Sequence, residues 1–395
     1  MNTQPIERSL RVAGLFAGIG GLDLGFERMG HQPVLMSEWD PAAMAVLQMH
    51  FPNVILKGDV REIGTLPAVD LVTGGFPCQD ISQAGTRDGL VGARSGMVWD
   101  FFRLIETSKP EFFVLENVSN LLSLKSGDVM RVLLQTIEHV GYRWAYRLVD
   151  TRGFRIPQRR QRVIILASRG DTNPEDVLLN QQFTPEHDDT PVEPGENIAY
   201  GFYWTEGRRG VGWTENAVPT IKGGSGLGIP SPPAVYLTNR RFAGTPSIED
   251  AERLQGFEPG WTDLEMDGKP FRPGVRWRLV GNAVSVPISE WLGEELAKPT
   301  HQSVKDRLEF APMQEGRPLP RAAFGDCNGW YGAQVTTHVR SSLHTPIDQF
   351  LVDPLRPLSK RALGGYLARA SQTTRRIPAR FLSDLREQYA LMENA

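Results

Sequence analysis

The first 170 residues alternate short apolar runs with stretches of helical spacing. Each apolar run is long enough for one buried strand, and several end at an acidic residue. The pattern predicts strands at 11–15, 33–38, 54–59, 69–73, 112–118 and 162–168, and helices at about 21–29 and 42–51. Strands that alternate with helices are typical of βαβ units, so we expect an α/β fold with a mostly parallel sheet. In such a sheet, functional residues gather at the carboxyl ends of the strands.

The pattern changes after residue 168, where the chain becomes polar and rich in turns. Residues 201–233 hold eight glycines and four prolines, too many for regular helices. We therefore read 169–248 as a small, loop-rich second domain. Helical spacing returns at 248–257 and at 286–296, and the chain then continues for about 95 residues that carry no motif.

Composition excludes several classes of protein. The chain has 395 residues, enough for two or three domains, and its two cysteines can form at most one disulfide bond. A disulfide-framed secreted scaffold and a cysteine-rich zinc module are excluded, and we expect no metal site. No apolar run approaches about 18 residues, and the first residues lack the order of a signal peptide. We expect a cytoplasmic protein that neither spans a membrane nor is exported.

The net charge of −3 hides an uneven distribution. Residues 301–395 carry 13 basic and 9 acidic side chains, which leaves 30 and 37 for the rest of the chain. Six arginines and one acid lie between Asp150 and Gly170. Because phosphate contacts are made by one face and not by an average, the overall charge does not exclude a nucleic-acid partner.

A glycine-rich loop, Phe16-Ala17-Gly18-Ile19-Gly20-Gly21, connects the first predicted strand to the first helix. Glycines let a ligand approach the backbone, although a tight turn without a ligand would have the same sequence. Acids end the next two strands, where Glu38 would take ribose hydroxyls and Asp59 an exocyclic amine, while Trp39 stacks on a base. The spacing does not match a phosphate-cradling loop, so a nucleoside without polyphosphate fits better.

Cys78 follows a predicted strand, two glycines and Pro77. A lone cysteine is most often a small buried residue. At the carboxyl edge of a parallel sheet, however, nearby helix N-termini favour a thiolate, which can act as a nucleophile. Glu116 lies at another strand end, where it is either a solvated acid or a proton donor to a substrate beside the thiolate.

A basic segment, Gln158-Arg159-Arg160-Gln161-Arg162, leads into the strand at 162–168. In an extended segment Gln158, Arg160 and Arg162 share one face, and Arg159 lies on the other. A solvated basic turn is the alternative, but three polar groups on one face before a buried strand favour a site.

These residues resemble the ordered motifs of the DNA (cytosine-5) methyltransferases. The matching blocks run in family order between residues 10 and 297, with a variable segment between the fourth and the fifth block. They are FAGIGG, Pro77-Cys78-Gln79, Glu116-Asn117-Val118, Gln158-x-Arg160-x-Arg162, Arg253-Leu254-Gln255-Gly256-Phe257 and Gly281-Asn282-Ala283-Val284. Ala283 stands where serine is common in the family. The resemblance implies a Rossmann-like methyltransferase domain with a small, loop-rich target recognition domain.

The resemblance also implies roles for individual residues. Cys78 would attack cytosine C6, Glu116 would hold the N3 edge of the base, and Arg162 would contact its O2 atom. Arg160 is also expected in the catalytic site. The residues implied to surround S-adenosyl-L-methionine are Phe16, Gly18, Gly20, Gly21, Glu38, Trp39, Asp59, Pro77, Asn282 and Val284. The residues expected to contact DNA are Gln79, Arg94, Gln158, Arg208, Arg209, Thr220, Ile221 and Lys222, of which Thr220-Ile221-Lys222 resembles the family's Thr-hydrophobic recognition element.

The same resemblance implies a domain organisation. The catalytic and cofactor-binding domain is expected at 10–168 and is completed by 270–297. The target recognition domain would occupy 169–248, and 249–297 would return to the catalytic domain. Residues 301–395 form a C-terminal extension that is either a packed helical appendage with solvated arginines or an added contact to the DNA backbone.

The predicted function is transfer of a methyl group from S-adenosyl-L-methionine to C5 of a flipped-out cytosine in a specific double-stranded DNA sequence. The protein would be a monomeric modification enzyme, solitary or beside a cognate restriction endonuclease. Two alternatives remain: an RNA (tRNA) cytosine-5 methyltransferase, and a catalytically inactive DNA-binding regulator. The tRNA-directed relative carries a Cys-Phe-Thr element, whereas no cysteine lies between 79 and 326 here.

Overall fold

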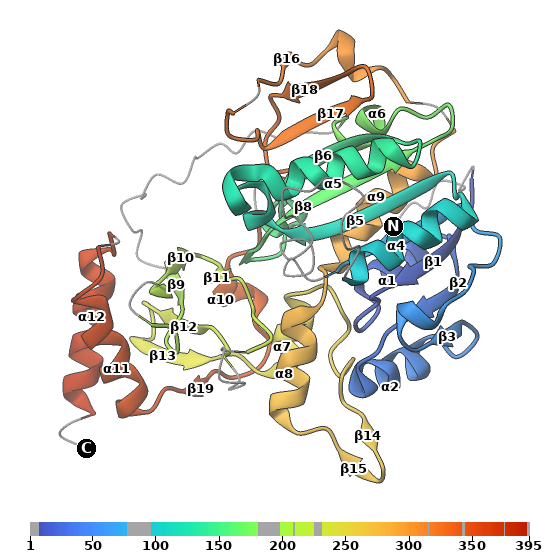
Figure 1. Cartoon of the computed structure of the whole chain (residues 1–395). Helices are drawn as coiled ribbons and strands as arrows, with labels where there is room; N and C mark the ends of the chain where they lie inside the picture. Colours follow the sequence, from blue (N-terminus) through green and yellow to red (C-terminus); the bar gives the residue numbers. More distant parts are fainter. Residues whose placement is uncertain are drawn as a thin grey trace. The chain divides into compact units, whose positions relative to one another are not determined.

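The computed structural model describes residues 8–76, 96–180, 198–207, 210–224, 231–299, 301–314, 316–341, 344–374 and 376–392. The chain forms two compact units (Figure 1). The first unit comprises Met1–Asp150, Gln161–Thr184 and Val284–Arg340, and the second comprises Thr151–Arg160, Pro185–Ala283 and Ser341–Ala395. The C-terminal 95 residues are therefore divided between the units. No helix in the described ranges is long and apolar enough to cross a membrane.

A ten-stranded sheet forms the centre of the first unit, in the order β16-β18-β17-β6-β8-β5-β4-β1-β2-β3. Five neighbouring strands are parallel, namely β1 (Arg11–Leu15), β2 (Gln32–Ser37), β3 (Ile55–Lys57), β4 (Leu71–Gly74) and β5 (Phe112–Val118). Following the pairings across the sheet, seven of the ten strands run in one direction. The fold is thus mixed α/β with a mostly parallel sheet, as predicted.

One strand pair was not anticipated from the sequence pattern. β6 (Arg143–Asp150) was missed, and β8 (Gln161–Ser168) runs antiparallel to both β5 and β6. The connection between β6 and β8 is ten residues, which is too short for the crossover that a parallel pair requires. The start of β8 therefore lies beside the end of β5.

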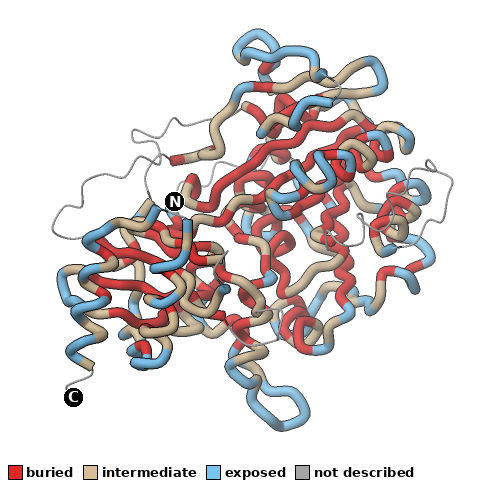
Figure 2. Tube along the Cα trace, turned by 60° about the vertical axis from the view of Figure 1, so that its left-hand side comes forward, coloured by how far each residue is buried: buried red, intermediate tan, exposed pale blue. Residues whose placement is uncertain are grey.

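Helices surround this sheet and complete its core. They are α1 (Gly21–Arg28), α2 (Pro41–His50), α4 (Met97–Ser108), α5 (Asp128–His139), α6 (Pro174–Leu178) and α9 (Val286–Leu296). Apolar side chains of α4 and α5, such as Phe101 and Leu134, pack with Phe113 of β5 in one buried cluster. The strands in the middle of the sheet, β8, β5, β4 and β1, are almost entirely buried (Figure 2).

Buried polar contacts join the start of β1 and helix α1 to helix α9. His31 accepts a hydrogen bond from Leu10 N at Nδ1 (3.0 Å), so its Nε2 donates to Gly293 O (2.9 Å) and the ring is neutral. On α1, a Cβ at Gly25 would lie 2.0 Å from Ser289 Oγ, so glycine permits the close contact with α9.

Residues 304–340 extend the central sheet. β17 (Ala322–Asp326) pairs with β6, and β18 (Gly329–Ala333) and β16 (Phe310–Pro312) continue the sheet beyond it. Arg147 of β6 is fully buried and donates to Leu178 O (3.2 Å), Thr336 O (2.8 Å) and His338 O (3.3 Å). Burial lowers the pKa of Arg147 to about 9, so the side chain remains protonated at neutral pH.

The second unit contains a five-stranded sheet in the order β10-β9-β12-β13-β19. Its strands are β9 (Ala199–Phe202), β10 (Trp213–Glu215), β12 (Ala234–Leu237), β13 (Phe242–Thr245) and β19 (Arg356–Pro357). The C-terminal helices α11 (Lys360–Ala370) and α12 (Ala379–Leu391) share a buried cluster with this sheet, in which Phe381 stacks on Tyr200 at 4.8 Å between ring centroids. The C-terminal helices therefore complete a core.

The remaining elements of the second unit carry its motifs. They are β7 (Gln158–Arg159), β11 (Val218–Pro219), α7 (Ile248–Arg253), the hairpin of β14 (Glu265–Met266) and β15 (Lys269–Pro270), α8 (Pro273–Asn282) and α10 (Ile347–Phe350). Asp250 of α7 accepts from Val352 N (3.0 Å) and from Arg253 Nη2 (2.6 Å). The buried Asp250 thus holds the backbone at Val352 against α7, the helix that ends at the first residue of the RLQGF motif.

Arg147→Met should lower the free energy of unfolding by roughly 2–4 kcal/mol, because one buried and two partly buried carbonyl groups lose a charged donor. Urea denaturation followed by circular dichroism measures the change. Arg11→Met, at an exposed position of β1, is the matched control and should change stability by less than about 0.5 kcal/mol. Equal effects of the two substitutions would show that Arg147 does not hold the sheet extension.

The stability of the protein should also depend on the protonation of His31. Burial lowers the pKa of His31 below its ordinary value of 6.5, so the unfolded chain binds the proton more readily than the folded one. The contribution of His31 is present above pH 6.5 and is lost as the pH falls through 6.5 toward the folded pKa. His31→Gln should therefore flatten the stability profile between pH 7 and 5, whereas His139→Gln, at an exposed position, should leave its slope unchanged.

Candidate active site

The glycine-rich loop is shaped by left-handed backbone conformations at the end of β1. Phe16, Gly18 and Gly20 have φ of 56°, 59° and 85°. A Cβ at Gly18 would meet nothing within 4 Å, so that glycine faces open space. A Cβ at Gly20 would lie 2.6 Å from Phe51 Cε2, so this position requires glycine for packing. Gly21 begins α1.

Glu38, at the end of β2, holds this loop. It is only 8% exposed, and its carboxylate accepts hydrogen bonds from Gly18 N (2.8 Å), Trp39 N (2.8 Å) and Asp40 N (2.9 Å). Three backbone donors suit an ionised carboxylate. The acid expected to bind ribose therefore also positions the glycine loop.

Trp39 and Asp59 lie beside Glu38. The ring of Trp39 is 69% exposed, which is unusual for tryptophan and leaves its face available for stacking. Asp59 bonds to Arg61 Nε (2.9 Å) and Arg61 N (2.9 Å), and the side-chain bond from Arg61 lowers the pKa of Asp59. Asp59 is thus ionised at neutral pH.

Four of the expected cofactor residues line one small pocket of the first unit. Its walls are Phe16, Ser37, Glu38, Trp39, Gly58, Asp59, Val60 and Met97. An exposed aromatic ring, two carboxylates and an open glycine loop match the base, the hydroxyl groups and the close backbone approach of a nucleoside. The residues present therefore fit the adenosine part of S-adenosyl-L-methionine. The other four, Ser37, Gly58, Val60 and Met97, were not singled out from the sequence, since none of them stands in a recognisable motif.

Glu116 and Arg162 meet where β5 ends and β8 begins. Arg162 Nε lies 2.7 Å from Glu116 Oε1, and both side chains are about 10% exposed. The antiparallel register pairs Glu116 with Ile164 and Val118 with Arg162, which places the two charged side chains near one another. Two residues expected to be catalytic are thereby brought together.

The same strand end contacts the backbone that leads into the cysteine motif. Asn117 Nδ2 donates to Phe76 O (3.0 Å), and an added Cβ at Gly75 would lie 3.6 Å from Glu116 Oε2. The chain just before Pro77 thus passes beside the carboxylate. Six of the expected site residues lie outside the described residues, namely Pro77, Cys78, Gln79, Arg94, Arg208 and Arg209.

Gln158 and Arg160 have surroundings that differ from the DNA-contacting and catalytic positions expected for them. Both are at most 2% exposed. Arg160 donates to Ile221 O (2.9 Å) and Ala283 O (2.6 Å), while Gln158 accepts from Ile221 N (2.9 Å) and donates to Leu254 O (2.7 Å). Their polar atoms serve the protein backbone, because β7 pairs with β11 in the interior of the second unit.

The Thr-hydrophobic element presents one polar side chain to its surface. Ile221 is fully buried, and Thr220 Oγ1 donates to Arg159 O (2.8 Å). Lys222 is partly exposed, with its Nζ 3.1 Å from Glu206 Oε1 and 4.2 Å from the ring centroid of Tyr203. Of the three residues in this element, Lys222 is the one that presents a charged group at the surface.

Asn282 and Val284 lie in the last matched motif. Asn282 ends α8 and is exposed, and Val284 is half-buried. A Cβ at Gly223 would lie 2.1 Å from Asn282 Oδ1, so the recognition element passes directly over the asparagine. Gln255 of the RLQGF motif donates to Val280 O (2.9 Å). This supporting role was not predicted, although the motif itself pointed to Gln255.

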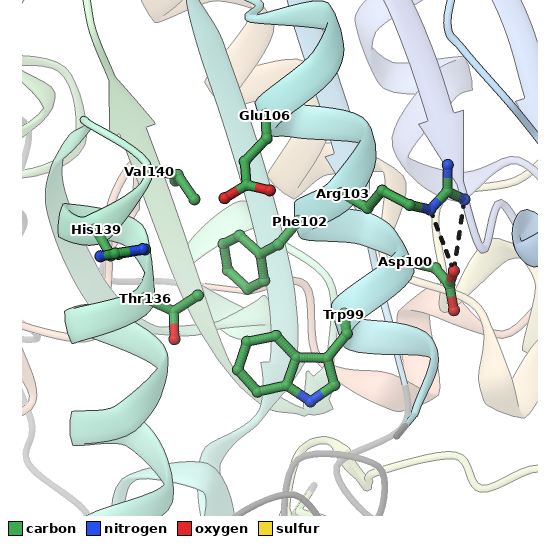
Figure 3. A pocket seen from close by; sticks show the side chains of 8 residues that line it. All are labelled: Trp99, Asp100, Phe102, Arg103, Glu106, Thr136, His139 and Val140. Carbon is green, nitrogen blue, oxygen red and sulfur yellow. Dashed lines mark hydrogen bonds and ion pairs between the residues drawn. The ribbon is translucent and has the colours of Figure 1, made fainter. Parts of the chain in front are cut away.

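A second pocket of the first unit lies between α4 and α5 and holds none of the expected site residues (Figure 3). Its walls are Trp99, Asp100, Phe102, Arg103, Glu106, Thr136, His139 and Val140, and Arg103 is paired with Asp100. Within the described ranges, no cluster of three or more histidine, cysteine or acidic side chains is arranged to hold a metal ion. The strand-end pocket is therefore the candidate site.

Comparison with known proteins gives the family. The model of C-5 cytosine-specific DNA methylases matches residues 10–200. Type II methyltransferase M2.BsuMI of Bacillus subtilis (strain 168) is 46% identical over 371 residues, which cover 92% of this chain and 94% of that protein. Type II methyltransferase M.NgoBI of Neisseria gonorrhoeae is 32% identical over 70% of this chain and 89% of its own length.

A solved structure agrees in fold. The crystal structure of the S. pombe Dnmt2 methyltransferase matches 73% of this chain and 98% of its own chain with a TM-score of 0.50 at 16% identity. At this identity the similarity concerns the fold alone. With the matched family model and the near full-length relative, the chain belongs to the C-5 cytosine-specific DNA methylases and is an S-adenosyl-L-methionine-dependent DNA (cytosine-5) methyltransferase.

Proposed function

We propose that this enzyme methylates C5 of a flipped-out cytosine within a specific double-stranded DNA sequence, through a covalent bond between Cys78 and cytosine C6. The observation that carries the proposal is the Glu116–Arg162 pair, 2.7 Å apart, beside the backbone that leads into Pro77-Cys78. This arrangement offers a carboxyl group and a cation to one edge of a planar base. Cys78 follows Phe76 by two residues, and Phe76 is hydrogen-bonded to Asn117, so the thiolate would reach the same base.

The chemistry of cytosine explains the need for these groups. C5 is a weak nucleophile, so addition of the Cys78 thiolate to C6, with Glu116 protonating or hydrogen-bonding N3, converts C5 into an enamine-like carbon. Arg162, paired with Glu116, would also hold the O2 atom of the base. After methylation, a base removes the C5 proton and the C6–S bond breaks, which restores the aromatic ring and frees Cys78.

S-adenosyl-L-methionine supplies the methyl group from its sulfonium centre and leaves as S-adenosylhomocysteine. Glu38, Trp39 and Asp59 would bind the adenosine part, with Phe16 and Gly18 forming the loop beneath it. Asn282, in the second unit, and Val284, in the first unit, are further cofactor contacts that the family resemblance implies.

Duplex DNA hides the C6 position of cytosine within the base stack. The target base must therefore be extruded, at a cost of a few kcal/mol. Gln79, Arg94, Arg208, Arg209 and Lys222 are the proposed DNA contacts. Gln158 and Ile221 are better assigned to support of the recognition element, because their polar or apolar groups are buried.

The Type II relatives support a modification enzyme that acts beside a cognate restriction endonuclease. We propose that the protein acts as a monomer, since one chain carries all six of the matched motifs. The match to DNA methylases favours DNA over the RNA substrate, and an active enzyme over the inactive regulator, that the sequence alone left open.

Cys78→Ser should abolish methyl transfer while cofactor binding and folding are retained, because a hydroxyl ionises far less than a thiol near neutral pH. Duplex DNA containing 5-fluorocytosine should trap the wild-type enzyme covalently, since fluorine does not leave as a proton does. Gel electrophoresis under denaturing conditions detects this adduct. Cys327→Ser, at the exposed second cysteine, is the control and should form it normally. An adduct with Cys78→Ser would refute the assignment, and an adduct with RNA alone would favour the tRNA alternative.

Glu38→Ala and Asp59→Ala should each weaken S-adenosyl-L-methionine binding roughly tenfold to hundredfold, the effect of losing a hydrogen bond to a charged group. Glu38→Ala should have the larger effect, because Glu38 also holds the glycine loop. Calorimetry with the cofactor and without DNA measures both, and Glu62→Ala, an exposed acid nearby, is the control. Unchanged affinity in both variants would leave these acids as structural caps.

A further inference from the structure

Two segments of the second unit lie in direct contact. The recognition segment, Thr220–Gly223, lies against the asparagine turn, Gly281–Ala283. A Cβ at Gly281 would lie 2.1 Å from Lys222 C, and a Cβ at Gly223 would lie 2.1 Å from Asn282 Oδ1. The backbone of Gly281 touches the backbone of Lys222, and the backbone of Gly223 touches the side chain of Asn282, so a shift of either segment must move the other.

Buried polar side chains hold this contact in one register. Arg160 Nη1 donates to Ile221 O (2.9 Å), and its Nη2 donates to Ala283 O (2.6 Å). One planar guanidinium thus spans both segments. Its two Nη atoms also lie 3.4 Å from Gly281 O, between those two bonds.

Two glutamines complete the arrangement. Gln158 Oε1 accepts from Ile221 N (2.9 Å), while its Nε2 donates to Leu254 O (2.7 Å). Gln255 Nε2 donates to Val280 O (2.9 Å). The same Nε2 lies 3.4 Å from Ala283 O, so Gln255 holds the asparagine turn. Gln158 holds the recognition segment, and Arg160 bonds to both segments.

We propose that Arg160 is a positioning residue that couples DNA sequence discrimination to cofactor binding, by holding the recognition segment and Asn282 in one register. The inference rests on the proposed function, which makes Lys222 a DNA contact and Asn282 a cofactor contact. The guanidinium is 2% exposed and its bonds are to protein carbonyls, so it acts through these residues and does not touch the substrate. Lysine cannot replace it, because one compact ammonium lacks the planar fork that reaches both segments.

The test compares Arg160→Lys with Gly223→Ala, which perturbs the same contact and leaves the buried guanidinium in place. Plasmid DNA is methylated in vitro and sequenced after bisulfite conversion, and methylation at the wild-type site is compared with methylation at sites that differ by one base pair. Calorimetry gives the affinity for S-adenosyl-L-methionine in the absence of DNA. Both variants should lower the discrimination ratio about tenfold and weaken the cofactor by a similar factor.

Arg147→Lys is the matched control, because Arg147 is another buried arginine that holds carbonyl groups, in the first unit. It should lower the melting temperature but leave the discrimination ratio and the cofactor affinity unchanged. If Arg160→Lys or Gly223→Ala melts at a lower temperature while both readouts keep their wild-type values, Arg160 is merely structural and the proposal fails. If Arg160→Lys does not fold, Gly223→Ala decides between the two outcomes. Wild-type protein that methylates no plasmid cytosine would instead refute the proposed function.

Discussion

One edge of the central sheet determines where chemistry can occur in the first unit. β1, β2, β4 and β5 are parallel and end at this edge, so the glycine loop, Glu38, Gly75 and Glu116 all emerge there. The antiparallel strand β8 begins at the same edge and adds a cation beside the last of these acids. A parallel arrangement thus supplies the acids, and a single antiparallel strand supplies the cation.

In both units, buried arginines hold together backbone segments that are distant in sequence. Arg147 and Arg160 each donate to backbone carbonyl groups of segments distant in sequence. A guanidinium has five donors in one plane, so it can join several strands or turns where no regular ladder exists. This geometry explains why an arginine stands in the middle of the buried strand β6.

The C-terminal 95 residues serve both units in different ways. Residues up to Arg340 add antiparallel strands to the β6 side of the central sheet, and residues after Ser341 cover the five-stranded sheet with two helices. Phe381 and Tyr366 are buried in that second core, whereas Arg380 and Arg386 are exposed. The helices of this region are thus packed on the sheet, as the helical-appendage reading expected, and their arginines lie at the surface. These arginines are accessible to a polyanion.

The sequence by itself determined the α/β class, the strands that carry Glu38, Glu116 and Arg162, and the family, because strand periodicity and short motifs are local properties of the chain. It could not determine that β8 is antiparallel, since the missed strand β6 sets that direction. Nor could it distinguish Arg162, paired with Glu116, from Arg160, enclosed by carbonyl groups. The two arginines share one face of an extended segment, and the partners that separate their roles come from β5, Ile221 and Ala283, which only tertiary packing brings near.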